Sequence, residues 1–437
     1  MLQKLHRIRR RPFVRNVAAL ASGTAAAQAI SMAFSPVVTR LFGPEAYGLQ
    51  GVFMSLAGLV AAIAAMTYPI AIVLPRSDAD ALGIARLSIY IGVATSLLVT
   101  VVLLFFGGSI LTVLNAEEVS AFMYLIPVFM FITVLVRVLQ QWSIRKKSFK
   151  LMARVSVWEA FAVNLTKLGM GIVNPVPVAL IVINTAGGLF HAAMLWVGLR
   201  KKPSLNPKRL AQVERASSAW DLARRHSDFP VLRAPQTFLN AASLGLPVFL
   251  LASLFGSEAA GFYAIAKTVL SVPTLLVGSS VMQVFYPHFN EAVYSGRNAR
   301  TVLIKAMLGM ATLGLIPYLA VIILGPLLFQ FVFGSEWRVA GEYAQWLAVW
   351  LFIVFLNRPI VAAIPVLRMQ GVFLIYEIIS ILSRGAALYV GSALFQSADF
   401  SVAVFSIVGA LLNALLIGYV LGFSQTAIGV LKRQERA

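Results

Sequence analysis

The sequence predicts an all-α integral membrane protein with twelve transmembrane helices in two parallel six-helix lobes, and with both termini cytoplasmic. Three observations support this prediction. The chain of 437 residues is 59% hydrophobic and only 12% charged, which is more apolar surface than a soluble domain can bury. One sequence motif returns 213 residues further along the chain. Lys and Arg concentrate in alternate loops, as they do in the cytoplasmic loops of membrane proteins.

Twelve apolar segments are each long enough to cross a hydrocarbon core of about 30 Å at about 1.5 Å per residue. Their expected centres are residues 28, 60, 95, 130, 164, 188, 242, 273, 312, 350, 383 and 411. The expected parts of the chain are a basic cytoplasmic arm (1–15), an N-lobe (16–200), a cytoplasmic linker (201–228), a C-lobe (229–424) and a cytoplasmic tail (425–437).

The repeat relates the two lobes. The stretch LFGPEAYGLQGVFMSL at 41–56 returns as LFGSEAAGFYAIAKTVL at 254–270, and in both copies a turn containing Gly and Glu joins two apolar segments. Downstream matches align Arg137 with Arg358, Glu159 with Glu377, and Lys167 with Arg384. Because six helices is an even number, the two copies insert the same way up, so the repeat is parallel.

The distribution of charge identifies the sides of the membrane. With the N-terminus inside, 31 of the 36 Lys and Arg residues lie in the arm, the inner loops, the linker or the tail. The net charge of +20 is therefore explained without nucleic acid as a partner. Cysteine is absent, and the four His show no metal-binding spacing. No phosphate loop or nucleophile triad occurs either, so we expect neither an enzyme nor a bound cofactor.

Two matched cations lie deep in the predicted bilayer. Lys167 and Arg384 are each about 18–21 Å from the cytoplasmic ends of their helices. A charge at that depth costs roughly 2.5–3.5 kcal/mol unless it faces a wet cavity or a partner. Two interpretations stay open, because both bases can line a central cavity that receives an anion, or they can form ion pairs between the lobes.

Three other charges have alternative roles. Glu159 and Glu377 are candidates for coupling through protonation, and the alternative is that they hold Arg137 and Arg358. Lys267 either extends toward the outer interface or widens the positive cavity.

The chain resembles a known family at this point. The pattern TRLFGPEAYGLQGVFMSLAGLVAAIAAMTYPIAIV, with the basic loop RKKSFK, looks like the Wzx-type oligosaccharide flippases of the multidrug/oligosaccharidyl-lipid/polysaccharide (MOP) exporter superfamily. The resemblance covers about residues 14–424 and implies a fold like that of the MATE transporters, which are members of this superfamily. It also implies alternating access, which carries an undecaprenyl-pyrophosphate-linked oligosaccharide from the cytoplasmic to the periplasmic leaflet of a bacterial inner membrane.

The resemblance implies roles for particular residues and partners. A sugar–pyrophosphate headgroup is large and anionic, so Lys167, Arg384 and Lys267 are where we expect it to bind. Asn164 either hydrogen-bonds a sugar hydroxyl or joins two helices, and Arg137 and Arg358 either anchor their helices at lipid phosphate or meet the entering pyrophosphate. The expected drive is an H⁺ or Na⁺ gradient. The expected partners are membrane lipids, a polysaccharide polymerase and a chain-length regulator, in the assembly of O-antigen (lipopolysaccharide), capsule or exopolysaccharide.

Four rival functions are weighed against this one. An ion-coupled multidrug exporter of the same superfamily typically has an acid in its first helix, and residues 16–39 contain none. A lipid II flippase usually has two further helices, for which this chain has no residues. A polysaccharide polymerase should show large periplasmic loops, which this sequence lacks. A membrane scaffold would not explain matched bases at mid-depth.

Overall fold

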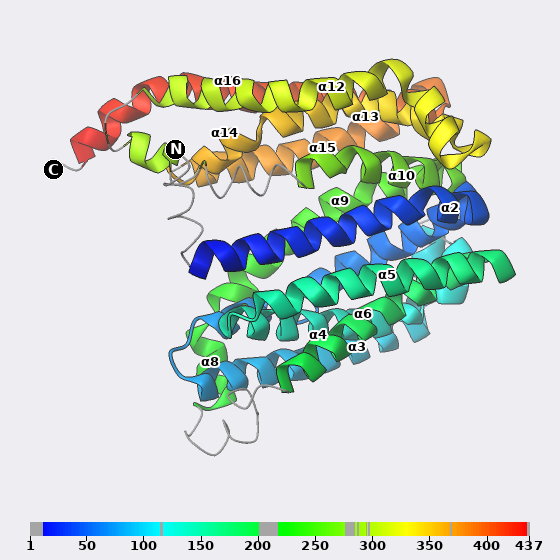
Figure 1. Cartoon of the computed structure of the whole chain (residues 1–437), viewed down its shortest axis with the longest axis horizontal. Helices are drawn as coiled ribbons and strands as arrows, with labels where there is room; N and C mark the ends of the chain where they lie inside the picture. The colour runs from blue at the N-terminus through cyan, green and yellow to red at the C-terminus, as the bar shows by residue number, and fades with distance from the viewer. Residues whose placement is uncertain are drawn as a thin grey trace. The chain divides into compact units, whose positions relative to one another are not determined.

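The computed structural model describes residues 12–113, 117–200, 217–275, 285, 288–293, 295, 298–367 and 369–434, and it describes the side chains of these residues except 12–18, 113 and 425–434. The predicted arm, most of the predicted linker and the tail side chains therefore lie outside the described residues. Every regular element in the described part is a helix. This agrees with the predicted all-α class (Figure 1).

The helices follow one another in this order: α2 (Pro12–Ile63), η1 (Tyr68–Val73), α3 (Asp78–Val113), η2 (Glu117–Phe122), α4 (Leu125–Arg145), α5 (Phe149–Val173), α6 (Pro177–Arg200), α8 (Ala219–Arg225), η4 (Phe229–Arg233), α9 (Ala234–Phe255), α10 (Ser257–Pro273), α12 (Ala299–Phe333), η6 (Ser335–Trp337), α13 (Arg338–Leu356), α14 (Arg358–Ala363), α15 (Gln370–Phe395) and α16 (Ala398–Gln434).

Nine helical segments of the described residues are long and apolar enough to cross a membrane, so the chain is a multi-pass membrane protein. All twelve expected centres lie in helices, but three of the twelve predicted segments do not count as separate membrane spans. The segment α2 holds two expected crossings in one element, and α10 is described over only 17 residues. The helix α5 has 25 residues, but its polar side chains reduce its hydropathy. The number of crossings and the sides of the two termini stay predictions.

The repeated motif forms the same backbone turn in both copies. Gly43, inside α2, has φ 72° and ψ 172°, and Gly256, between α9 and α10, has φ 87° and ψ 167°. Gly334, between α12 and η6, adopts φ 113° and ψ 168° in a third Phe-Gly-x-Glu sequence, which the sequence analysis did not identify. This backbone region is open almost only to glycine. The motif therefore specifies a sharp turn between two helices wherever it occurs.

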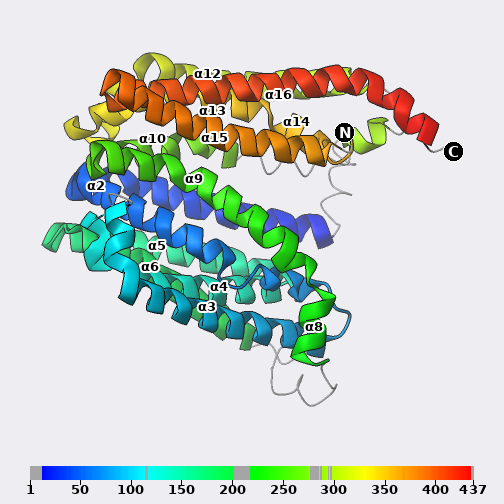
Figure 2. The same ribbon diagram turned by 180° about the vertical axis from the view of Figure 1, so that it is seen from behind.

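The chain divides into two compact units, Met1–Ser253 and Leu254–Ala437, which we describe separately. In unit 1, α2 runs beside α5 (Figure 2), and a Cβ on Gly23 would lie 2.4 Å from Cβ of Ala153, so the two backbones are in close contact. The helix α9 belongs to unit 1, although the sequence places it first in the C-lobe. It approaches the second half of α2, where a Cβ on Gly245 would lie 3.2 Å from Cβ of Ser55.

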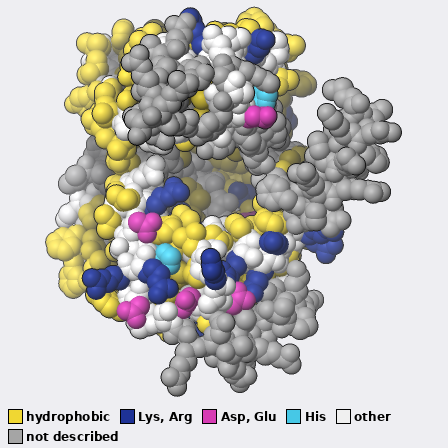
Figure 3. Space-filling view, turned by 90° about the vertical axis from the view of Figure 1, so that its left-hand side faces the viewer, with side chains coloured by type: hydrophobic (Ala, Val, Ile, Leu, Met, Phe, Trp, Pro, Cys, Tyr) yellow, Lys and Arg dark blue, Asp and Glu magenta, His cyan; other side chains and the backbone are white. Residues whose placement is uncertain are grey.

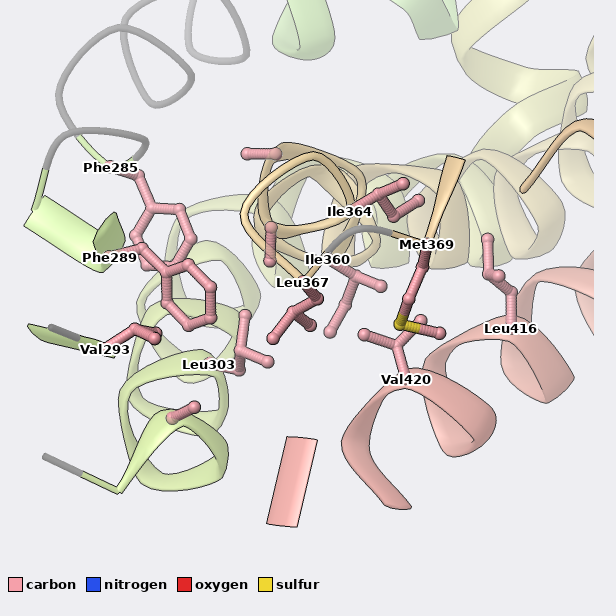
Figure 4. Packing of buried hydrophobic residues seen from close by; sticks show 13 residues of the cluster. Phe285, Phe289, Val293, Leu303, Ile360, Ile364, Leu367, Met369, Leu416 and Val420 are labelled. Atoms are coloured by element: carbon pink, nitrogen blue, oxygen red, sulfur yellow. The ribbon is translucent and has the colours of Figure 1, made fainter. Parts of the chain in front are cut away.

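Unit 2 is held together by α12, α13, α15 and α16. A Cβ on Gly341 of α13 would lie 2.5 Å from the carbonyl oxygen of Gly325, so α12 and α13 touch backbone to backbone. At one end of the unit, Leu303 of α12, Ile360 of α14 and Val420 of α16 pack with two stacked phenylalanines (Figure 4). Burial of these side chains fixes α14 against its neighbours.

Candidate functional site

Two of the predicted cations lie against one aromatic cluster in unit 2. The Arg384 guanidinium of α15 lies 5.1 Å from the ring centre of Trp350 and 5.7 Å from that of Phe405. The Lys267 ammonium of α10 lies 5.6 Å from the ring of Tyr263, which itself meets Phe405 edge to face at 6.2 Å. The sequence analysis expected Lys167, Arg384 and Lys267 in one positive site, with a Lys267 that extends toward the outer interface as the alternative. The structure brings Lys267 and Arg384 to one cluster, and their role in binding stays a prediction.

The Arg384 side chain is fixed by its own helix and by the rings. Its Nε donates to the Ser380 carbonyl at 3.0 Å, one turn earlier on α15. Cation–π contacts contribute roughly 0.5–2 kcal/mol each, more where water is excluded. The nearby Lys267 adds a second positive charge, and like charges repel strongly away from bulk water. This arrangement can attract an anion and offer a flat apolar surface beside it.

Lys167 belongs to unit 1, on α5, and is partly exposed. It makes no hydrogen bond or ion pair with the residues that the structure describes. One turn before it, Asn164 is buried and donates from Nδ2 to Ser31 Oγ at 3.1 Å and to the Ala160 carbonyl at 2.7 Å. The bond to Ser31 joins α5 to α2, and the bond to Ala160 lies within α5. Whether either residue binds substrate stays a prediction.

Glu159 pairs with a histidine that the sequence analysis did not single out. His191 Nδ1 of α6 lies 2.5 Å from Glu159 Oε2 of α5, and His191 Nε2 lies 3.3 Å from Gln140 Nε2 of α4. The alternative in which Glu159 holds Arg137 is therefore wrong. Arg137 instead donates from Nη1 to the Ala62 carbonyl at 3.4 Å.

The corresponding positions of unit 2 differ. Glu377 is partly exposed and forms no ion pair with any residue in the described ranges. The alternative in which it holds Arg358 is therefore not what the structure shows. The Nε of Arg358 is buried and has no hydrogen-bond partner in the described part of the chain. Next to it, Asn357 donates from Nδ2 to Asn413 Oδ1 at 2.9 Å.

A polar clamp closes one end of unit 1. The guanidinium of Arg145, at the end of α4, uses all five of its N–H groups: it contacts Asp78 Oδ1 at 2.9 Å and the carbonyls of Ile72, Pro75, Arg76 and Ser77. Lys146 binds the other oxygen of Asp78. The sequence analysis treated this basic run only as a cytoplasmic loop. In the structure it fixes the turn between η1 and α3.

The segment containing α8 docks on the same end of unit 1. Asp80 Oδ1 accepts from the Ser217 backbone N–H at 2.9 Å, and Tyr68 Oη donates to the Ala223 carbonyl at 3.1 Å. Thr67 Oγ1 donates to the Phe229 carbonyl at 3.0 Å. Basic and acidic side chains gather on this face of the unit (Figure 3). The part of the predicted linker from residue 217 onward is therefore attached to unit 1.

The described residues contain no group of three or more His, Asp or Glu that could hold a metal ion.

The sequence contained a signal for the contact between Glu159 and His191, and the sequence analysis missed it. Glu159 lies 10 residues from the start of α5 and His191 lies 9 residues from the end of α6, so the two reach similar depths on consecutive antiparallel helices. The aromatic cluster had no such signal, because its members are far apart in the sequence.

Comparison with known proteins gives a family and a fold. Residues 37–342 match a family model described as polysaccharide biosynthesis protein. No curated protein sequence matches the chain. The structure is similar to an inward-facing multidrug resistance MATE family transporter of the MOP superfamily, with a TM-score of 0.74, 14% identity, and coverage of 93% of this chain and 96% of that one. It is also similar to the lipid II flippase MurJ in an inward closed conformation, with a TM-score of 0.71, 10% identity, and coverage of 92% and 86%.

Proposed function

The chain belongs to the polysaccharide biosynthesis protein family, and from this premise we propose that it is a flippase for undecaprenyl-pyrophosphate-linked oligosaccharides. It moves these lipids from the cytoplasmic to the periplasmic leaflet of a bacterial inner membrane, for surface polysaccharide assembly. It works by exposing a cationic site alternately to the two sides. The fold shared with MATE transporters and MurJ supports a carrier rather than an enzyme.

The pair of Lys267 and Arg384 on one aromatic cluster carries the proposal. Basic side chains are expensive within membrane helices and mark the paths of substrates and ions. Arg binds phosphate through two parallel hydrogen bonds, and Lys binds it as a point charge. Ligand sites combine aromatic walls with a few polar groups that fix orientation. A pyrophosphate beside a sugar matches both features of this cluster in unit 2.

The test is transport by the purified protein in liposomes that contain an undecaprenyl-pyrophosphate oligosaccharide. Removing a hydrogen bond to a charged group costs about 1.5–3 kcal/mol. We therefore expect Arg384→Ala to reduce the transport rate about 10- to 150-fold, and Lys267→Ala and Lys167→Ala to reduce it less. The control is Arg338→Ala, since Arg338 is 60% exposed and its only described ion pair is with Glu342 one turn along, at 3.8 Å.

Two outcomes would contradict the proposal. Full transport by the Arg384→Ala and Lys267→Ala double variant would show that these bases are structural. Transport of lipophilic cations, without transport of the lipid-linked oligosaccharide, would instead identify an ion-coupled multidrug exporter.

A further inference from the structure

Three polar side chains from three helices form one hydrogen-bonded chain inside unit 1. Gln140 comes from α4, His191 from α6 and Glu159 from α5, and the two contacts measure 3.3 Å and 2.5 Å. The side chain of His191 is only 8% exposed and that of Glu159 is 31% exposed. The buried imidazole of His191 therefore joins two partly exposed side chains, the amide of Gln140 and the carboxylate of Glu159.

This chain lies well inside its helices, away from their ends. His191 is 9 residues from the end of α6 at Arg200, or about 13 Å along the axis. Glu159 is 10 residues from the start of α5 at Phe149, or about 15 Å. Ionisable side chains at such depths are rare in membrane helices, and where His and Glu occur together they typically relay protons.

The contacts define one protonation state. With the Gln140 amide nitrogen facing it, Nε2 of His191 accepts a hydrogen bond, so the imidazole is neutral and its Nδ1–H donates to Glu159. A proton that binds at Nε2 turns this atom from acceptor to donor. The Gln140 amide must then rotate to present its oxygen or lose the contact. Proton uptake thus changes the contact between α4 and α6, while the new positive charge strengthens the contact with Glu159.

The other charged groups near this chain are engaged elsewhere or have no contact with it in the described part. On α4, Arg137 binds a backbone carbonyl and Arg145 binds Asp78. On α5, Lys150, Arg154 and Lys167 make no described hydrogen bond to Glu159 or His191. The helix α2, which also packs on α6, has no ionisable residue between positions 19 and 39. Glu159 is therefore the ionisable residue that contacts His191 in the described part of the chain.

We propose that Gln140, His191 and Glu159 form a proton-binding site that couples proton uptake to a change in the packing of α4 against α6, and thereby to transport. A hydronium ion gives its proton to Nε2 of His191 and becomes water, so one O–H bond breaks as the N–H bond forms. The coupling rests on the proposed transport function, but the proton site does not. Unit 2 has no equivalent within the described residues, since Glu377 has no His partner there.

The first test needs no substrate. The full-length chain contains four histidines, at positions 6, 191, 226 and 288. In protein labelled with ¹⁵N-histidine and held in lipid nanodiscs, the His191→Asn spectrum assigns the His191 imidazole. When a proton binds, we expect the Nε2 resonance of His191 to change from that of an acceptor nitrogen to that of a donor nitrogen. Glu159→Gln should lower its proton affinity about tenfold or more, because a neighbouring negative charge is removed.

Matched variants on α4 keep this test decisive if Glu159→Gln does not fold. Gln140→Glu, which offers only acceptors to Nε2, should raise the proton affinity of His191 about tenfold. Gln141→Glu is the control, because Gln141 makes no side-chain hydrogen bond in the described residues, and it should change the affinity much less. An imidazole that does not titrate, or whose affinity responds equally to the two α4 variants, would overturn the proton site.

The second test measures coupling in liposomes. The ratio of the oligosaccharide transport rate with an imposed pH difference to the rate without it should exceed one in the native protein. In His191→Asn it should fall to about 1, the value without coupling. A native ratio retained by His191→Asn would overturn the coupling. If the native protein moves no oligosaccharide, the proposed function fails, and the titration alone then decides whether the proton site exists.

Discussion

The repeated motif forms the same turn at Gly43 and at Gly256, but the matched polar residues of units 1 and 2 have different surroundings. Glu159 of unit 1 is paired with His191, whereas Glu377 of unit 2 has no ion-pair partner in the described part. Arg384 of unit 2 lies on Trp350 and Phe405, whereas Lys167 makes no described aromatic contact. The repeat has thus kept its backbone turns, while its polar interiors have diverged. In our proposals, unit 1 binds the proton and unit 2 supplies most of the contacts to the anion.

The largest expected loss of stability comes from the polar clamp around Arg145 in unit 1. Arg145→Ala removes five donated hydrogen bonds and leaves Asp78 with only Lys146. Both side chains are partly buried, and removing hydrogen bonds to charged groups costs about 1.5–3 kcal/mol, so the free energy of unfolding in detergent should fall by at least that amount. The exposed Lys150→Ala is the control and should change it by less than about 0.5 kcal/mol.

The same change can be made at Arg368, which the repeat aligns with the end of this basic run and which lies outside the described residues. An equal loss of stability in Arg368→Ala would indicate a second clamp and would narrow the difference between the units. A normal stability of Arg145→Ala would contradict the clamp itself.

The next largest loss of stability is expected at the two glycine turns of the repeated motif. Gly43→Ala and Gly256→Ala both force a Cβ into a backbone region that only glycine occupies readily, so each should cost about 1–3 kcal/mol of unfolding free energy. Gly58→Ala and Gly309→Ala are matched controls within helices, where nothing lies within 4 Å of the added Cβ. They should be neutral or slightly stabilising. A loss at only one of the two turns would show that the turns are not equivalent.

The smallest effect concerns the matched bases. Arg384→Lys keeps the charge but loses the flat guanidinium on Trp350 and Phe405, which should raise the concentration of lipid-linked oligosaccharide needed for half-maximal transport about 2- to 30-fold. Lys167→Arg loses no described contact and should change that concentration less than twofold. Equal effects of the two exchanges would mean that the aromatic cluster does not distinguish the sites.

The sequence predicted features that depend on periodicity and repetition. Apolar segments located the helices, and the motif at 41–56 and 254–270 predicted equivalent turns, because both signals are local. The partner of Glu159 was missed, since the sequence does not show which faces of α5 and α6 meet. The five contacts of Arg145 were also missed, because a basic loop predicts only a side of the membrane. The rings around Arg384 come from two other helices, α13 and α16, and only the fold brings them together.

The glycine turns have a consequence for how this chain can vary. Every single-nucleotide change in a glycine codon that alters the encoded amino acid supplies a Cβ. At positions 43, 256 and 334, therefore, no single-nucleotide substitution can give a residue that fits the turn as glycine does. The sequences of the helices on either side can change during evolution, but these three glycines are expected to stay.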